Sequence, residues 1–157
     1  MLSKVAKPHW AARWELSSIA NTHFPNDAFT NKNGEAIGRG WYESSLQLGY
    51  VVIDRGLIIG YNGKEIILEN YEILCGNDEY FQWIKCHGPY KPMLFIVPLE
   101  AGHESDQREL YVARTLHNDH YVYGKAGWHL KQGMSYAIGK REFCAKDYEI
   151  LTIKQMM

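Results

Sequence analysis

One tetrapeptide occurs twice in this chain, in places far apart. Tyr-Glu-Ile-Leu stands at residues 71–74 and again at residues 148–151. The repeat extends beyond this motif, because residues upstream of both copies also match and keep their order over almost the whole chain. Each copy of such a repeat is expected to form one supersecondary unit, so the repeat constrains the fold more than local propensity does.

The matching residues divide the chain into two units, residues 10–75 and residues 79–152. Besides the tetrapeptide, the matches are Trp14 with Trp83, Pro25 with Pro98, Ala28 with Ala101, Gly38-Arg39-Gly40 with Ala113-Arg114-Thr115, Gly49 with Gly124, Gly56 with Gly133, Lys64-Glu65 with Arg141-Glu142, and Asn70 with Asp147. The connection, Gly76-Asn77-Asp78-Glu79, is a turn and no Pro- or Gly-rich linker. We therefore expect both units to pack as one body.

Both units consist mainly of segments typical of β-strands. Residues 57–59 and 93–97 are apolar runs too short for an ordinary helix, and residues 109–114 alternate in polarity. Residues 10–20 contain good helix formers, so a helix there stays open beside a strand that begins at Trp14. The sequence predicts an all-β protein, made of two pseudo-symmetric antiparallel β repeats packed as one compact body.

The charge balance argues against nucleic acid as a partner. The chain has 17 Lys and Arg against 18 Asp and Glu, whereas a nucleic-acid binder normally has a basic surplus. No apolar stretch approaches the roughly 20 residues that span a bilayer. The first ten residues, MLSKVAKPHW, contain no apolar signal region, so we expect a cytoplasmic or non-classically secreted protein.

Residue types that carry catalysis or bind metals lack the patterns that these chemistries need. Cys75, Cys86 and Cys144 are an odd number without CxxC spacing, which favours reduced thiols. No nucleophile elbow surrounds Ser135, so we expect no enzyme. Residues 117–120, His-Asn-Asp-His, fit a polar hairpin loop as well as a metal site, and we expect neither a metal nor a cofactor.

The order of motifs resembles the DM-nine repeat family. In the second unit the similar residues are Trp83, Pro98-Leu99-Glu100-Ala101, Glu104, Leu110-Tyr111-Val112-Ala113-Arg114, Gly124-Lys125, Gly139-Lys140-Arg141-Glu142 and Tyr148-Glu149-Ile150-Leu151. The first unit is a weaker copy of the same series. The resemblance implies a β-rich tandem-repeat protein, often a homodimer, and at least one member of the family is a mannose-specific lectin that needs no metal ion.

The resemblance also implies a sugar site. The acidic residue and the Lys of Gly-Lys that hold the sugar in lectin-type members correspond to Glu104 and Lys125. A carboxylate accepts hydrogen bonds from sugar hydroxyls and an ammonium donates to their oxygens. His103, Tyr123 and Trp128 are near enough in sequence to line the same pocket. The alternative is that Glu104 and Lys125 form an exposed ion pair, or never meet.

The first unit differs at both positions of the implied site. Asn31 stands in place of the acid and Tyr50 in place of the Lys, so this second site is either lost or retuned to another sugar. The predicted function is therefore a metal-independent lectin for mannose-type or related hexoses. The competing hypothesis is an intracellular protein- or vesicle-interaction module without sugar binding, which the unpaired thiols favour.

Overall fold

The computed structural model describes residues 9–154, and within them every regular element except one short 3-10 helix is a β-strand. The first six strands are β1 (Ala12–Ser18), β2 (Ala36–Tyr42), β3 (Ser45–Val52), β4 (Gly56–Tyr61), β5 (Lys64–Leu68) and β6 (Asn70–Gly76). The 3-10 helix η1 (Asp78–Tyr80) leads into β7 (Phe81–His87), β8 (Val97–Pro98), β9 (Glu100–His103), β10 (Glu109–His117), β11 (His120–Ala126), β12 (Met134–Ile138), β13 (Arg141–Ala145) and β14 (Asp147–Ile153).

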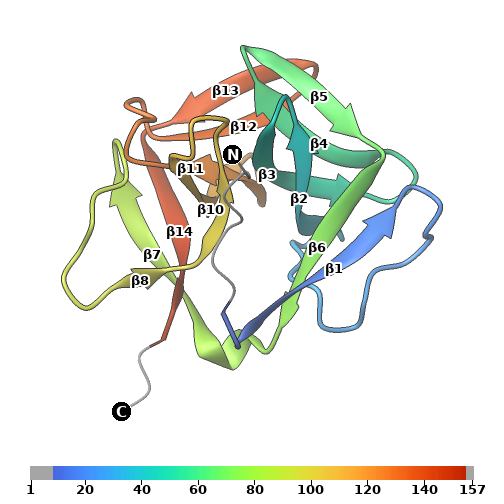
Figure 1. Ribbon diagram of the computed structural model, residues 1–157, viewed down its shortest axis with the longest axis horizontal. Helices are drawn as coiled ribbons and strands as arrows, with labels where there is room; N and C mark the ends of the chain where they lie inside the picture. The colour runs from blue at the N-terminus through green and yellow to red at the C-terminus, as the bar shows by residue number, and fades with distance from the viewer. Residues whose placement is uncertain (1–8, 155–157) are drawn as a thin grey trace.

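The order of the strands in the sheet shows the pseudo-symmetry. It runs β1-β6-β2-β3-β4-β5-β13-β12-β11-β10-β14-β7, so each strand of the first half has a counterpart at the same distance from the other end. In Figure 1, β6 and β1 lie on the right of the molecule, and β14 and β7 on the left. The predicted fold class, two pseudo-symmetric antiparallel β repeats in one body, is confirmed. The limits of the two copies, 10–75 and 79–152, stay a prediction.

A close approach between strands explains one pair of repeated glycines. A Cβ atom at Gly49 would lie 1.9 Å from the carbonyl oxygen of Ile58, and one at Gly124 would lie 2.0 Å from that of Ser135. Real Cβ atoms never come so close to backbone atoms, so both positions require glycine. The sequence match between these glycines therefore reflects the same packing of two strands in each half.

The helix considered for residues 10–20 is wrong, because β1 occupies most of that segment. β1 pairs with β6 in antiparallel register, with Trp14 opposite Leu74. The guanidinium of Arg39 lies 4.2 Å from the centre of the Trp14 ring. Contacts with β6 and Arg39 outweigh the modest helix propensity of the alanines in this segment.

The Glu of the repeated tetrapeptide pairs with the repeated arginine. Arg39 donates to Glu72 at 2.9 Å, and Arg114 donates to Glu149 at 2.8 Å. Arg39 also donates to the carbonyl oxygen of Ala101 at 2.9 Å.

Strands of both halves join into a closed ring. Going round it, β3, β4, β5, β13, β12, β11, β10 and β9 follow one another, and β9 returns to β3 where His103 faces Leu46. A Cβ atom at Gly102 would lie 2.2 Å from the carbonyl oxygen of Leu46, so this junction also needs glycine. Closure leaves no unpaired edge within the ring.

The main hydrophobic core draws on both halves of the chain. Its buried members include Leu48 and Ile58 from the first half and Val112 and Val122 from the second. Two smaller clusters each belong to one half, at residues 36–75 and at residues 90–150. Because the central core is shared, burial of apolar surface holds the two halves together.

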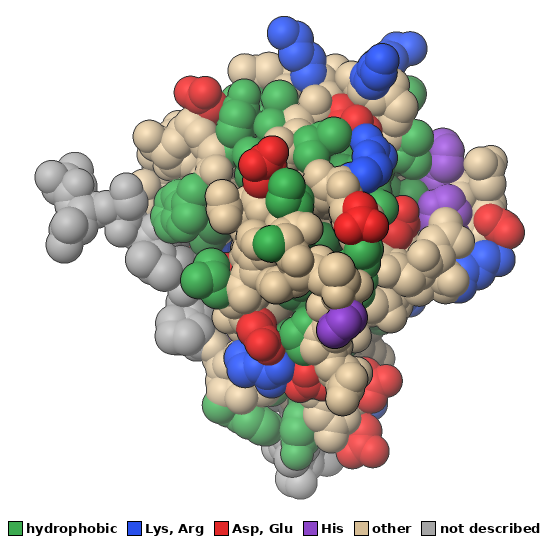
Figure 2. Space-filling view, turned by 90° about the vertical axis from the view of Figure 1, so that its right-hand side faces the viewer, with side chains coloured by type: hydrophobic (Ala, Val, Ile, Leu, Met, Phe, Trp, Pro, Cys, Tyr) green, Lys and Arg blue, Asp and Glu red, His purple; other side chains and the backbone are tan. Residues whose placement is uncertain are grey.

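In Figure 2, some Lys and Arg side chains project near one another at the top edge, and the others lie beside Asp and Glu. Among residues 9–154, no helix is long and apolar enough to cross a membrane. Cys75, Cys86 and Cys144 are free thiols, and burial raises the pKa of Cys75 to about 11.

Candidate functional site

A polar pocket of about 330 Å³ opens where segments from both halves meet. It contains side chains from the β4–β5 turn, from the loop between β9 and β10, and from β11 and β13. The lining includes Tyr61, Glu104, Asp106, Arg108, Lys125 and Glu142. Both residues of the sequence-based candidate pair therefore line one pocket.

Lys125 lies in β11 with its ammonium almost fully buried. Its Nζ donates to the side-chain oxygen of Gln47 at 2.6 Å and to the carbonyl oxygen of Gly60 at 2.9 Å, and it lies 3.9 Å from Glu142. Burial lowers the pKa of Lys125, and the charges of Glu104 and Glu142 offset only part of this effect. Two hydrogen bonds use two of the three N–H groups, so one N–H stays available.

Glu104 directly follows β9 and begins a tight turn. Its backbone N–H donates to the carbonyl of Arg108 at 2.8 Å, and its carbonyl accepts from Gln107 at 3.0 Å. The carboxylate interacts with Gln47 Nε2 at 2.8 Å and with His129 Nε2 at 2.7 Å. Burial alone would raise the pKa of Glu104, but the His129 contact and the charge of Lys125 outweigh it and hold the pKa below its usual value.

Gln47 connects the two candidate residues. Its amide nitrogen donates to Glu104 while its amide oxygen accepts from Lys125, and its side chain is fully buried in β3. This arrangement fixes the orientation of the amide, because only the oxygen can accept from an ammonium. The side chains of Glu104 and Lys125 are 18% and 5% exposed, so the exposed ion pair that the sequence left open is wrong.

Glu142 closes one side of the pocket. Its carboxylate accepts hydrogen bonds from the hydroxyl of Ser135 and, at 2.9 Å, from the backbone N–H of Gly63. A Cβ atom at Gly60 would lie 2.7 Å from this side chain, so the absence of a side chain at position 60 makes room for it. Two carboxylates therefore flank the buried ammonium of Lys125.

Tyr61 supplies an aromatic wall. The ammonium of Lys125 lies 5.5 Å from the centre of its ring, at the outer limit of a cation–π contact. The ring meets Tyr42 edge-on, with the centroids 5.0 Å apart. The pocket thus combines two cations, three carboxylates and an aromatic face, a combination suited to a small polyhydroxylated ligand.

The family model for the DM9 repeat matches residues 31–143, the greater part of the chain. This chain belongs to the DM9 repeat family. All the pocket residues described above lie inside the matched region.

The fold is similar to the crystal structure of the nematode sperm cell motility protein MFP2B, with a TM-score of 0.59 at 12% identity. The likeness covers 99% of this chain but 49% of MFP2B, so the chain spans about half the length of that protein. The comparison with curated proteins gives no match.

The structure separates the other three candidate residues from the pocket of Glu104 and Lys125. Tyr123 is buried in the main core and stacks on Trp83, with the centroids 6.2 Å apart. His103 is also buried, and its Nδ1 contacts the carbonyl of Glu104 at 2.9 Å. Trp128 is 56% exposed and lines a neighbouring hollow. Tyr123 lies two residues before Lys125 and therefore on the same face of β11, but its ring packs against Trp83 in the core. Nearness in the sequence therefore does not bring these side chains together with the pair.

The first DM9 copy places Asn31 and Tyr50 in structural contacts. Tyr50 donates to the carbonyl of Ala137 at 2.8 Å, as Lys125 donates to the matching carbonyl of Gly60. Asn31 donates to Glu35 at 2.7 Å and to the carbonyl of Tyr121 at 2.8 Å, while its oxygen accepts from backbone N–H groups. These contacts occupy both polar ends of the Asn31 amide.

The residue that matches Gln47 in the other DM9 copy is apolar. Gly40 pairs with Gln47 in the first copy, and Thr115 pairs with Val122 in the second. Because Gly40 and Thr115 correspond in the repeat, Val122 is the counterpart of Gln47. The second site, implied at Asn31 and Tyr50, therefore has no acidic residue, no lysine and no connecting amide at the corresponding positions.

Sequence reasoning missed Gln47, His129 and Glu142 as members of the site. Gln47 had a detectable signal, since it is the one strongly polar side chain in the apolar strand SLQLGYVV. A buried polar residue in such a run needs partners, and such partners often belong to a binding site. Nothing in the local sequence of His129 points to Glu104, because the two meet only through the fold.

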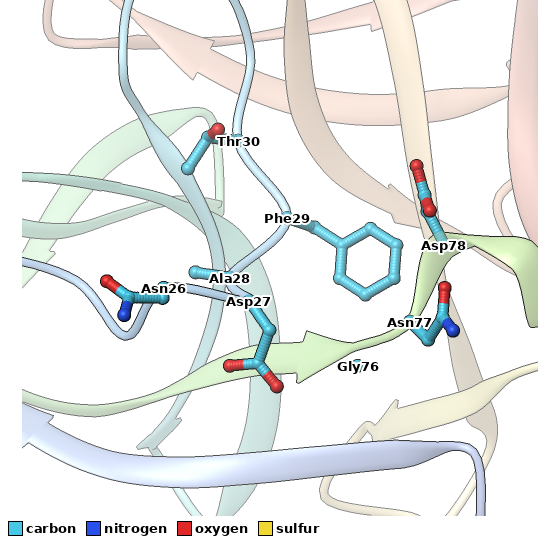
Figure 3. A pocket seen from close by; sticks show the side chains of 8 residues that line it. All are labelled: Asn26, Asp27, Ala28, Phe29, Thr30, Gly76, Asn77 and Asp78. Atoms are coloured by element: carbon cyan, nitrogen blue, oxygen red, sulfur yellow. The ribbon is translucent and has the colours of Figure 1, made fainter.

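A larger pocket of about 560 Å³ lies elsewhere, between the segment 26–30 and the turn 76–78. In Figure 3, Phe29 projects between these two segments. The carboxylate of Asp27 accepts two hydrogen bonds from Arg13, both of 2.9 Å, and Asn77 caps η1. The lining of this pocket has two carboxylates and no basic side chain, whereas the pocket at Lys125 offers charges of both signs and is the better candidate for a ligand.

Proposed function

We propose that this protein is a carbohydrate-binding module that holds a hexose, of the mannose type or related to it, between Glu104 and Lys125. The observation that carries the proposal is the bridge through Gln47, which holds an acceptor anion and a donor cation at one open pocket. Membership of the DM9 repeat family supports a binding module. Sugar recognition by this chain is the step that we add.

The chemistry of the pair suits neighbouring hydroxyl groups. Glu104 can accept hydrogen bonds from hydroxyls, while the remaining N–H of Lys125 can donate to a hydroxyl or ring oxygen. Hydrogen bonds with a charged partner are about twice as strong as neutral ones. Because both charges come from side chains, the site needs no metal ion to orient the sugar.

Preorganisation supports the same proposal. Gln47, Gly60 and His129 hold the two charged groups in place before any ligand arrives. Binding then orders few side chains, and each side chain that stays mobile until binding would cost about 0.5–1.5 kcal/mol. A pocket of about 330 Å³ also falls in the usual size range for small-molecule sites.

A second candidate function is an intracellular protein- or vesicle-interaction module without sugar binding. One observation favours it: Leu94 and Phe95, in the loop before β8, are 83% and 77% exposed. Exposed apolar side chains of this size often mark contact surfaces. The likeness to a sperm cell motility protein concerns the fold alone and adds no partner.

Calorimetry separates these two functions. The unmodified protein is titrated with mannose, galactose and glucose at millimolar concentration, with and without a chelator. The proposal expects heat with at least one hexose and no effect of the chelator. If none of the three sugars produces heat, the lectin hypothesis is rejected in favour of the interaction module.

A further inference from the structure

A second hollow of about 330 Å³ adjoins the pocket of Glu104 and Lys125. Arg108 lines both cavities, and His129, which lines the second, contacts the Glu104 carboxylate at 2.7 Å. The other walls of the second hollow are mainly aromatic and apolar, with Tyr90, Pro92, Tyr111 and Trp128. The two cavities therefore share a wall but differ in chemistry.

Trp128 is an exposed aromatic side chain in the wall of this hollow. Its side chain is 56% exposed, although burying an aromatic ring would be favourable. The Lys131 ammonium lies 4.7 Å from the centre of the indole and donates to the Trp128 carbonyl at 3.0 Å. The indole thus has a fixed neighbour while much of its surface stays open.

The tyrosines complete an aromatic surface beside the indole. Tyr90 and Tyr111 lie 4.8 Å apart between ring centroids, at a tilt of 48°. The hydroxyl of Tyr111 donates to the Glu109 carboxylate, which holds the ring in place. A ligand that uses this hollow therefore meets ordered rings.

A tight turn sets the spacing between the two cavities. The N–H of Leu130 donates to the carbonyl of Gly127 at 3.1 Å, and a Cβ atom at Gly127 would lie 2.8 Å from the ring of His129. Glycine therefore lets the chain turn closely enough to place His129 on Glu104 and the adjacent Trp128 in the second hollow. The indole and the carboxylate are held together as neighbours.

We propose that the two cavities form one groove for an oligosaccharide, in which Trp128 and Tyr111 contact the sugar unit next to the one held by Glu104 and Lys125. This inference rests on the proposed function. A pyranose ring has an apolar face of C–H groups, which aromatic rings cover well, whereas its hydroxyls need the charged pocket. A polar pocket beside an aromatic hollow matches two linked hexoses better than one.

The other cavity beside the charged pocket is less suited to the second sugar unit. A smaller hollow of about 240 Å³ shares Tyr61 and Asn62 with the charged pocket. Tyr42 and Ile66 line it together with the charged Glu43 and Lys64, and its lining contains no tryptophan. This smaller, partly charged hollow offers less to the apolar face of a sugar, so the second unit lies on the side of Trp128.

The experiment compares sugars of increasing length. Calorimetry with mannose, mannobiose and linear mannotriose on the unmodified protein gives the ratio of disaccharide to monosaccharide affinity. We expect a ratio of roughly ten, because one additional aromatic contact typically changes affinity by about that factor. Trp128→Ala is expected to bring the ratio close to one, and Trp128→Phe to an intermediate value.

The matched control is Trp10→Ala. Trp10 is 70% exposed and packs against Tyr80, away from both cavities, so its removal should leave the ratio unchanged. Tryptophan fluorescence of the unmodified protein gives a second measurement, with a larger change for mannobiose than for mannose. The groove is overturned if the affinity ratio of the unmodified protein is near one, or if Trp128→Ala does not alter the ratio. In both cases, binding of mannose alone would still support the single-hexose site. Absence of heat with every sugar rejects both.

Discussion

Gln47 of the first DM9 copy accepts a hydrogen bond of 2.6 Å from Lys125 of the second. The same amide donates to Glu104, so a residue of one copy connects the two charged groups of the other. Gly60, also of the first copy, supplies the second acceptor for Lys125. The candidate site is therefore a product of two copies, and neither could form it alone.

The first prediction concerns Glu104→Gln. The change preserves the shape but removes the negative charge, so hexose affinity should fall roughly ten- to thirty-fold, which corresponds to about 1–2 kcal/mol. Because the Glu104 carboxylate is mostly buried and contacts Gln47 and His129, the free energy of unfolding should also fall, by about 1 kcal/mol. Calorimetry and thermal melting measure the two effects. Glu69→Gln, on an exposed acid, should change neither, and full affinity in Glu104→Gln would contradict the site.

The second prediction concerns Gln47→Val, which installs the residue found at the matching position, Val122. Lys125 and Glu104 each lose a partner inside a buried environment, so the free energy of unfolding should fall by about 1–3 kcal/mol. Hexose affinity should fall as well, because the two charged groups are no longer held together. Urea unfolding and calorimetry test this. Gln82→Val, on the exposed face of β7, is the control, and equal losses in both variants would count against the bridge.

The third prediction concerns the pH dependence of sugar binding. The pKa of Glu104 lies below its usual value of 4.5, so the carboxylate persists in mild acid and affinity should fall only below that value. Burial lowers the pKa of Lys125 from 10.5, so its charge, and with it the affinity, should be lost at a pH below 10.5. Affinity measured across the pH range should form a plateau between these limits. Affinity that already falls on acidification while the pH is still above 4.5 would indicate that another group controls binding.

Both shifts make the free energy of unfolding rise with pH, each in its own window. Between the lowered pKa of Lys125 and 10.5, the unfolded chain binds more protons than the folded one, so this group makes stability rise with pH in that window. Glu104 stabilises the fold at pH values above 4.5 and loses that contribution as the pH falls through its lowered pKa. Unfolding curves of the unmodified protein and of Glu104→Gln at several acidic pH values should converge as the pH falls.

The fourth prediction concerns the repeated arginine. Arg114 lies between Trp83 and Tyr121, at 4.1 and 3.9 Å from their ring centres, and pairs with Glu149. Arg114→Lys keeps the charge but loses the planar stacking, so the free energy of unfolding should fall by about 1–2 kcal/mol without a change in sugar affinity. Chemical unfolding measures the loss. Arg55→Lys, at an arginine that is 52% exposed and has a 3.5 Å contact with Glu65, should be nearly neutral. An equally small effect at position 114 would show that the stacking adds no stability.

The fifth prediction concerns assembly. β1 and β7 end the order of strands, so each has an edge without a partner among the described strands. Such edges commonly pair with another chain, and two-fold dimers are the commonest soluble oligomers. We therefore expect a homodimer, with a light-scattering mass near twice the 18.2 kDa of one chain. A mass near 18.2 kDa at micromolar concentration would reject the dimer.

The sequence by itself determined the fold class and the candidate pair. Each Tyr-Glu-Ile-Leu motif supplies the glutamate that pairs with the arginine of its half. Gly49 and Gly124 each allow a close backbone contact between strands. Because both halves need these contacts, the repeat is visible in the sequence. Glu104 and Lys125 could be selected because they occupy motif positions. Local patterns carry this information since they depend on strand periodicity and close backbone contact.

Only the tertiary structure decided what surrounds that pair. Gln47 and His129 reach Glu104 from segments remote in the sequence, and no local pattern records a contact that ring closure creates. Tyr123 and Trp128, expected in the same pocket, point into the core and into the neighbouring hollow. The physical reason is that the alternation along a strand fixes only the face on which a side chain lies, whereas the pairing of distant strands decides which part of that face holds the ligand.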